Sequence, residues 1–199
     1  MGVLNFILLY PSFQLPRGRG INLRGYAGRY SRIDVYARAI VLASIANRFA
    51  ATAGSNIIVR VTAVLPYDSG ISVLSYSSGS ILGEKEAVFK ILKSLYKKDN
   101  IIENNYYNSI SEWVYELVEE NPGKLIQLEE TGEDISKVEI DAENGASFLL
   151  GPHTDPPAEI IKSIRKMIPV TTASIGPKSL LATHTIAYLL TLTINSTVR

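Results

Sequence analysis

The sequence predicts an α/β protein whose mostly parallel sheet is flanked by helices, and two observations support this prediction. In the last third of the chain, two short strand-like segments alternate with two helix-like segments. Strands that are joined through helices pair in parallel. Nearer the N-terminus, an apolar run at 3–10 precedes apolar residues at helical spacing after Ser31. The 199 residues are long enough for one domain with a sizeable core.

The first half of the chain is expected to begin with a strand at 3–10. A loop rich in glycine and arginine follows, and Ser31 is placed to cap a helix that ends near Asn47. The segment Asn56–Pro66 is rich in β-branched residues, which predicts a strand that ends at the proline. A turn and a returning segment at 71–77 complete a hairpin.

A capping box marks one helix in the middle of the chain. Ser109 and Glu112 have the spacing at which each side chain reaches a free backbone N–H of the first turn, so a helix should run from here to near Glu120. The other elements expected in this region are an amphipathic helix at 84–97, a polar connector at 99–108, a short strand at 124–128 and a turn at 131–134.

The last third is expected to repeat a strand–loop–helix unit. Asp155 before Pro156 fits an N-cap with proline in the first turn. The expected elements are a strand at 147–150, a loop at 151–157, a helix at 158–167, a strand at 170–175, a loop at 176–178 and a helix from 179 to about 195.

Composition excludes several kinds of site. The chain has no cysteine and two histidines, which leaves no thiol nucleophile, no disulfide and no multi-histidine metal centre, so no metal is expected. The apolar N-terminus lacks the basic region of a signal peptide, and His184 and several threonines would be costly in a membrane-spanning helix. We therefore expect a soluble, cytoplasmic protein.

Charge is unevenly distributed although the net charge is only +1. Residues 17–38 hold six arginines and one acid, whereas residues 99–143 hold thirteen of the nineteen acids. Such asymmetry fits one region facing a polyanion, and it equally fits a solvated arginine-rich loop.

Two loops remain as candidate ligand sites after the common motifs are searched. The chain has no P-loop, no GxSxG elbow and no EF-hand loop. The loops at 151–155 and 176–178 follow the last two strands, where open α/β sheets bind ligands. Glycine lets a ligand approach the backbone, and proline stiffens the turn. A flat ligand held by backbone groups fits such loops, but a tight turn without function would have the same pattern.

Four segments resemble a known family. FLLGPH (148–153) and SIGPKSLLATHTI (174–186) resemble the C-terminal knot of the SPOUT RNA methyltransferases. GRYSRIDVYARAI (28–40) and LEETGEDISKVEI (128–140) resemble one branch, the archaeal tRNA pseudouridine-54 N1-methyltransferases. The resemblance implies a single domain over 1–199 with a trefoil knot at about 147–195, a homodimer, S-adenosylmethionine as cofactor and tRNA as substrate.

The resemblance also assigns residues to the cofactor and shows three departures. Asp155 stands where the family has glycine, Pro152 where it has an acid, and Thr185 where relatives have cysteine. The residues that would contact the cofactor are Leu150, Gly151, Ser174, Ile175, Gly176, Pro177, Leu181, Ala182 and Thr183.

The reaction that the resemblance implies is methylation of N1 of pseudouridine. It needs in-line positioning and help in removing the N1 proton and in stabilising the resulting anion. Arg32 and Asp34 are the catalytic candidates: an arginine can favour the base anion, and a carboxylate can accept the proton or orient the arginine. If the helix has begun at Arg32, the two side chains point to different faces and need not pair. The alternative for Asp34, which the pattern favours slightly, is an acid in the first turn that stabilises the helix dipole. The candidates for RNA contact are Arg17, Arg19, Arg24, Arg29, Arg38 and His153.

Each of these candidates has a structural alternative. Arg38 could be a buried ion-pair partner, and His153 could support its loop. His184 is expected in the core or at a subunit interface, and Trp113 in the core. Two other functions stay open: methylation of another RNA base, such as ribosomal pseudouridine, and RNA binding without catalysis.

Overall fold

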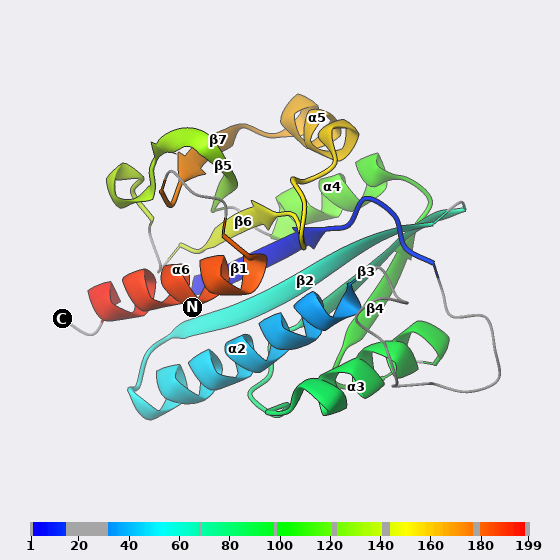
Figure 1. The fold of residues 1–199 in the computed structure, drawn as a ribbon, viewed down its shortest axis with the longest axis horizontal. Coiled ribbons are helices and arrows are strands. Elements are labelled where there is room, and N and C mark those ends of the chain that lie inside the picture. The colour runs from blue at the N-terminus through cyan, green and yellow to red at the C-terminus, as the bar shows by residue number, and fades with distance from the viewer. Residues whose placement is uncertain are drawn as a thin grey trace.

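The computed structural model describes residues 2–14, 32–67, 69–97, 99–120, 123–140, 144–176 and 180–197. They form a seven-stranded sheet flanked by helices (Figure 1). The strands are β1 Gly2–Leu9, β2 Ile57–Tyr67, β3 Gly70–Tyr76, β4 Glu103–Tyr107, β5 Lys124–Asp134, β6 Ala146–Leu150 and β7 Val170–Ser174. The helices are α2 Ile33–Thr52, α3 Glu84–Tyr96, α4 Ile110–Glu120, α5 Ala158–Met167 and α6 Ala182–Thr197, with a 3₁₀ turn at Ile135–Lys137.

The sheet is mostly parallel, which confirms the predicted fold class. Its strand order is β4-β3-β2-β1-β6-β5-β7. The pairs β1–β2, β1–β6, β5–β6 and β5–β7 are parallel, whereas β3 is antiparallel to both β2 and β4. The carboxyl ends of β1, β2, β5, β6 and β7 therefore lie along one edge of the sheet.

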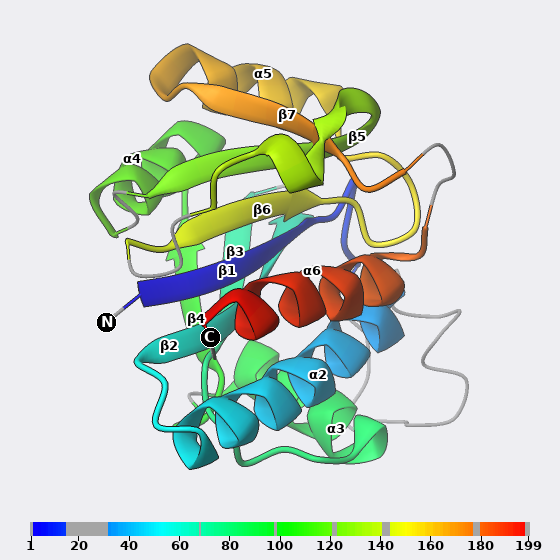
Figure 2. The same ribbon diagram turned by 90° about the vertical axis from the view of Figure 1, so that its left-hand side faces the viewer.

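Helices cover both faces of the sheet and bury two apolar clusters. The larger cluster lies under α2, α3 and α6, and Phe6 of β1 stacks on Phe148 of β6 within it, with ring centroids 5.2 Å apart. The smaller cluster lies under α4 and α5 and contains Trp113, which is 3% exposed, as predicted. Figure 2 shows α6 lying beside α2 on the face of the larger cluster.

The segment at 99–108 was predicted to be a connector, but it contains β4, so this prediction is wrong. β4 is an edge strand that pairs with β3 from Glu103 to Tyr107. Its first four residues are exposed and only Tyr107 is buried. An edge strand with so little burial has no apolar alternation in its sequence, which explains why the pattern did not reveal it.

The predicted turn at 131–134 is also wrong, because β5 continues through it. The register of β5 against β7 jumps from Leu128 to Glu133, so the residues between them leave the ladder as a bulge. The strand resumes at Glu133 and ends at Asp134. The bulge lies at the carboxyl edge of the sheet.

The ends of several helices and strands differ from the predictions. The N-cap of α2 is Arg32 and not Ser31, and the N-cap of α5 is Pro157 and not Asp155. β2 was expected to end at Pro66 but continues to Tyr67. Val64 is the last residue of β2 that pairs with β1. Pro66 lies beyond it, so the N–H that proline lacks is not needed for a bond to β1. One half of the capping box is confirmed, because Ser109 Oγ accepts from the N–H of Glu112 at 3.2 Å. The Glu112 carboxylate accepts from the N–H of Asn108 at 2.8 Å, one residue before the expected Ser109.

The predicted trefoil knot stays a prediction, because residues 177–179, which connect β7 to α6, lie outside the described residues. Within the described ranges, no helix has the length and apolarity to cross a membrane. The same residues contain no group of His, Asp and Glu side chains arranged to hold a metal ion.

Candidate active site

The carboxyl edge of the sheet brings together the elements that carry the candidate residues. β6 and β7 end there and lead toward α5 and α6. The start of α2 is held at the same edge, because the Tyr10 hydroxyl, one residue after β1, donates to the carbonyl oxygen of Arg32 at 3.1 Å. Burial raises the pKa of Tyr10 far above its ordinary value, so this hydroxyl stays protonated and keeps donating.

A cavity of about 220 Å³ lies at this edge between the ends of β5, β6 and β7 and the start of α6. Its walls combine apolar residues and two glycines with polar side chains, including two carboxylates of β5 and one of the β6–α5 loop. The lining residues are Leu128, Glu129, Glu130, Leu150, Gly151, His153, Thr154, Asp155, Pro156, Ser174, Ile175, Gly176, Leu180, Leu181, Ala182 and Thr185.

Glycine is required in both loops of the cavity, for different reasons. A Cβ at Gly151 would overlap the carbonyl oxygen of Thr154, so the β6–α5 loop closes only without a side chain there. Gly176 has φ +139°, which other residues rarely adopt. Ser174 Oγ accepts from the Gly176 N–H at 3.2 Å and fixes this turn. The backbone of both loops is therefore shaped next to the cavity.

Most residues that the resemblance assigned to the cofactor line this one cavity. They are Leu150, Gly151, Ser174, Ile175, Gly176, Leu181 and Ala182. Thr183 is not among the lining residues, and Pro177 lies outside the described residues. His153, assigned to RNA contact, is exposed and also lines the cavity.

The sequence analysis assigned no residue of β5 to the cofactor or to RNA. Leu128, Glu129 and Glu130 line it because the β5 bulge turns toward the β6–α5 loop. The segment 128–140 was recognised as similar to the family, but its strand was expected to stop at Leu128. A strand that continued past this residue would have placed both glutamates at the carboxyl edge.

Arg32 and Asp34 form a bidentate ion pair, which overturns the expectation that they point apart. Arg32 Nε and Nη2 donate to Asp34 Oδ1 and Oδ2 at 3.0 and 3.1 Å. The expectation assumed that Arg32 is helical, but it precedes the helix in the left-handed conformation, with φ +62°. This backbone turn lets the side chain fold back over the first turn of α2.

Asp34 is the buried centre of a larger charge network. Its side chain is 1% exposed, and Arg38 Nη2 lies 3.2 Å from its Oδ2. Arg38 in turn lies 3.3 Å from Glu84 of α3. Arg38 is thus an ion-pair partner as the alternative reading expected, but at 44% exposure it is not buried.

The network leaves the guanidinium of Arg32 charged, fixed and reachable. The hydrogen bond to Asp34 raises the pKa of Arg32 above its ordinary value, so it stays protonated. Its side chain is 38% exposed. Because both oxygens of Asp34 accept from arginines, its clearest role is to orient Arg32.

The remaining candidates are four arginines before α2 and His184. Arg17, Arg19, Arg24 and Arg29 lie outside the described residues. His184 is exposed on α6, so the core alternative is wrong for it, while the interface alternative stays a prediction.

A family model described as "Putative SAM-dependent RNA methyltransferase" matches residues 81–195 of the chain. The chain belongs to this family. The matched residues include every residue that lines the cavity. S-adenosylmethionine is therefore the cofactor, and RNA is the class of substrate.

A solved structure of another protein, Nep1, shares the fold of this chain. Nep1 of Archaeoglobus fulgidus, solved with S-adenosylhomocysteine bound, matches with a TM-score of 0.51 at 15% identity over 96% of each chain. Lpg2936 of Legionella pneumophila, solved with SAM bound, gives a TM-score of 0.46 at 11% identity over 98% of this chain and 66% of the other. No curated protein sequence matches the chain. The match to Nep1 shows that the two chains share a mixed α/β fold.

Proposed function

We propose that the chain methylates N1 of pseudouridine 54 in the T-loop of tRNA, using S-adenosylmethionine bound in the cavity at the carboxyl edge. The observation that carries the proposal is Arg32, a fixed cation at the start of α2 on the same edge. The resemblance of 28–40, which contains Arg32 and Asp34, to the pseudouridine-54 branch supports this choice of base.

The nucleophile of the reaction is N1 of pseudouridine, which becomes nucleophilic only after it loses its proton. The cofactor, when bound, would supply a methyl group on a sulfonium: the N1 electron pair forms the new N1–CH₃ bond, and the electron pair of the broken S–CH₃ bond stays on sulfur. The N1 proton passes to solvent, and the charge that remains on the imide oxygens and N1 is stabilised by Arg32. Asp34 holds the guanidinium in place and so reduces the reorganisation that the step requires.

The cavity residues suit the cofactor they are proposed to hold. Backbone groups of the two glycine loops can bond the adenine edge, and Leu150 and Leu181 offer apolar walls to its ring. Glu129, Glu130 and Asp155 carry negative charge beside a cofactor whose sulfonium and ammonium outnumber its carboxylate. Pro177 is included in the cofactor site on the resemblance alone.

We also propose that two copies associate through the outer surface of α2 and α6. Exposed apolar side chains lie on α2 (Ile45 and Phe49) and on α6 (Tyr188 and Leu192), and the exposed Leu181 directly precedes α6. The two helices lie side by side (Figure 2). Ile45 and Phe49 are one turn apart on α2, as Tyr188 and Leu192 are on α6, so each pair shares one face of its own helix. A second copy that covers this face would bury His184 at the interface. We further propose that the C-terminal region forms a trefoil knot. The proposed RNA contacts are made by arginines that precede α2: Arg17, Arg19, Arg24 and Arg29.

Methylation of matched transcripts tests the substrate. A tRNA transcript carrying pseudouridine at position 54 should accept labelled methyl groups, and the same transcript with uridine should not. Equal methylation of both would defeat the pseudouridine proposal. Methylation of a ribosomal RNA pseudouridine in place of the tRNA would favour the alternative substrate, and binding of RNA without binding of cofactor would favour a non-catalytic module.

A further inference from the structure

A second, larger cavity of about 750 Å³ lies between α5 and the end of β5. We call it the α5 groove. Its lining residues are Gln127, Glu129, Glu130, Thr131, Asp155, Pro156, Ala158, Ile161, Lys162, Arg165 and Lys166. Glu129, Glu130, Asp155 and Pro156 also line the cofactor cavity, so the two cavities adjoin.

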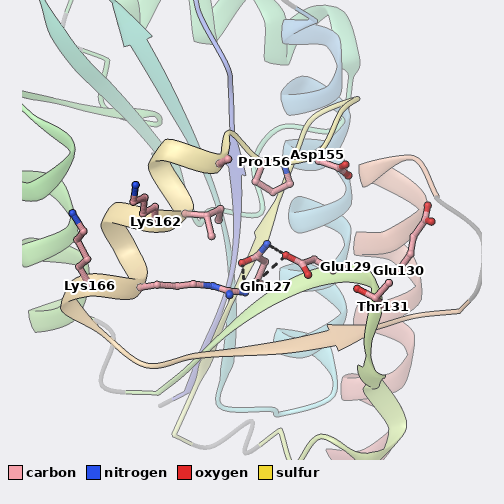
Figure 3. A pocket seen from close by; sticks show the side chains of 11 residues that line it. Gln127, Glu129, Glu130, Thr131, Asp155, Pro156, Lys162 and Lys166 are labelled. Carbon is pink, nitrogen blue, oxygen red and sulfur yellow. Dashed lines mark hydrogen bonds and ion pairs between the residues drawn. The ribbon is translucent and has the colours of Figure 1, made fainter.

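The α5 groove is polar at both ends, with opposite charge. Figure 3 shows Lys162 and Lys166 on the α5 side and Asp155 and Glu130 at the other end. The acidic end adjoins the cofactor cavity, and the lysine end points away from it. A ligand that enters this groove from the cofactor cavity therefore meets cations at its far end.

The three cations of the groove differ in what they bind. Arg165 is bonded within the protein, because its Nη2 donates to Gln127 Oε1 at 2.9 Å and to Thr172 Oγ1 at 3.0 Å. It also lies 3.8 Å from Glu129, which accepts from the Gln127 amide. Arg165 thus ties α5 to β5 and β7 and offsets the charge of Glu129.

Lys162 and Lys166 have no such partner. Within the described part of the chain, neither ammonium group has an ion pair or a hydrogen bond. The two are one helical turn apart, and like charges at this spacing destabilise a helix slightly. Lys166 lies in the last turn, where a cation also offsets the helix dipole, but Lys162 lies mid-helix and gains nothing from that effect.

We propose that the α5 groove binds the sugar–phosphate backbone of the RNA beside the nucleotide that is methylated, with phosphates at Lys162 and Lys166. The proposal rests on the assignment of the cofactor to the adjoining cavity. The target base must reach the methyl group, so the flanking backbone has to lie against the surface around that cavity. The lysine end offers two uncompensated cations there, and the acidic end offers acceptors for ribose hydroxyl groups.

Salt dependence of RNA binding tests the proposal, because each phosphate contact adds to the slope of log K against log salt. The probe is an RNA hairpin with the T-loop sequence, and the test variant is Lys162→Gln/Lys166→Gln. Loss of two contacts should lower the slope by about 1.4 to 1.8 and weaken binding at low salt by about tenfold or more. Binding of S-adenosylmethionine should not change.

The matched control is Lys97→Gln/Lys137→Gln, which removes the same charge from two exposed lysines that do not line the groove. Its slope should equal that of the unaltered protein. The proposal is overturned if the test variant keeps the original slope, if the control loses as much, or if the unaltered protein does not bind the hairpin. Equal methylation of uridine and pseudouridine transcripts would refute the proposed base while leaving a slope difference at the groove intact.

Discussion

The two parts of the candidate site, the cavity proposed to hold the cofactor and the Arg32–Asp34–Arg38 network, are built in different ways at the same edge of the sheet. The cavity is shaped by backbone, with Gly151 and Gly176 at positions that reject a side chain. The network is made of side chains, with a buried carboxylate between two half-exposed arginines.

The difference suggests a division of labour. Backbone groups in tight loops can hold a cofactor of constant shape, and they tolerate changes of side chain around them. A charge that must act on a reacting base needs a side chain held in one orientation, and the ion pair supplies this. Substitutions in the two parts should therefore affect different steps.

The largest effect is expected at Arg32. Arg32→Ala removes the cation proposed to stabilise the base anion, so kcat should fall by about 100-fold to 1000-fold. Calorimetry should find the affinity for S-adenosylmethionine unchanged. A variant that lost cofactor affinity in proportion to its activity would contradict the separation of the two parts.

The next effect is expected at Gly151. Gly151→Ala places a methyl group against the carbonyl oxygen of Thr154, so the loop must open and cofactor affinity should fall by about tenfold or more. Gly83→Ala is the matched control, because a Cβ there meets nothing within 4 Å. Equal cofactor affinity in both variants would show that the loop backbone does not shape the site.

Substitution of Phe49 tests the proposed association of two copies. Phe49 is 54% exposed on α2, so covering the exposed part in both subunits would contribute about 1.5–3 kcal/mol in total. Phe49→Glu should therefore raise the dimer dissociation constant by at least about tenfold, measured by sedimentation. If the unaltered protein sediments as a monomer at all concentrations, the dimer proposal fails.

Asp34→Asn should uncouple Arg32 from its support without removing it. Because the two arginines are 38% and 44% exposed, the loss of unfolding free energy should be limited to about 1–2 kcal/mol, measured by denaturant titration. The methylation rate should fall by about tenfold, since Arg32 becomes mobile. An unchanged rate in a stable variant would show that Asp34 does not orient Arg32.

The smallest effect is expected at Thr185, with the nearby Thr183 as its comparison. Thr185 lines the cavity and is 4% exposed, whereas Thr183 does not line it. Thr185→Val should weaken cofactor binding by about threefold, the loss of one ordinary hydrogen bond, and Thr183→Val should leave it unchanged. The reverse result would favour the residue assignment made from the resemblance.

The same contrast governs what could be predicted from the sequence. The two glycine loops were predicted because glycine and proline between a strand and a helix have few structural solutions. The pairing of Arg32 with Asp34 was not, because it depends on a left-handed residue that the sequence pattern does not indicate. β4 and the β5 bulge were missed for a similar reason: edge and bulged strands depend on their neighbours, and their own polar sequences resemble loops.

A crystal structure of the protein with S-adenosylhomocysteine would test the central claim most directly. We predict that the ligand lies in the cavity between the ends of β5, β6 and β7, in contact with the backbone of Gly151 and Gly176. Density for the ligand in the α5 groove or at another surface, with this cavity empty, would contradict the account.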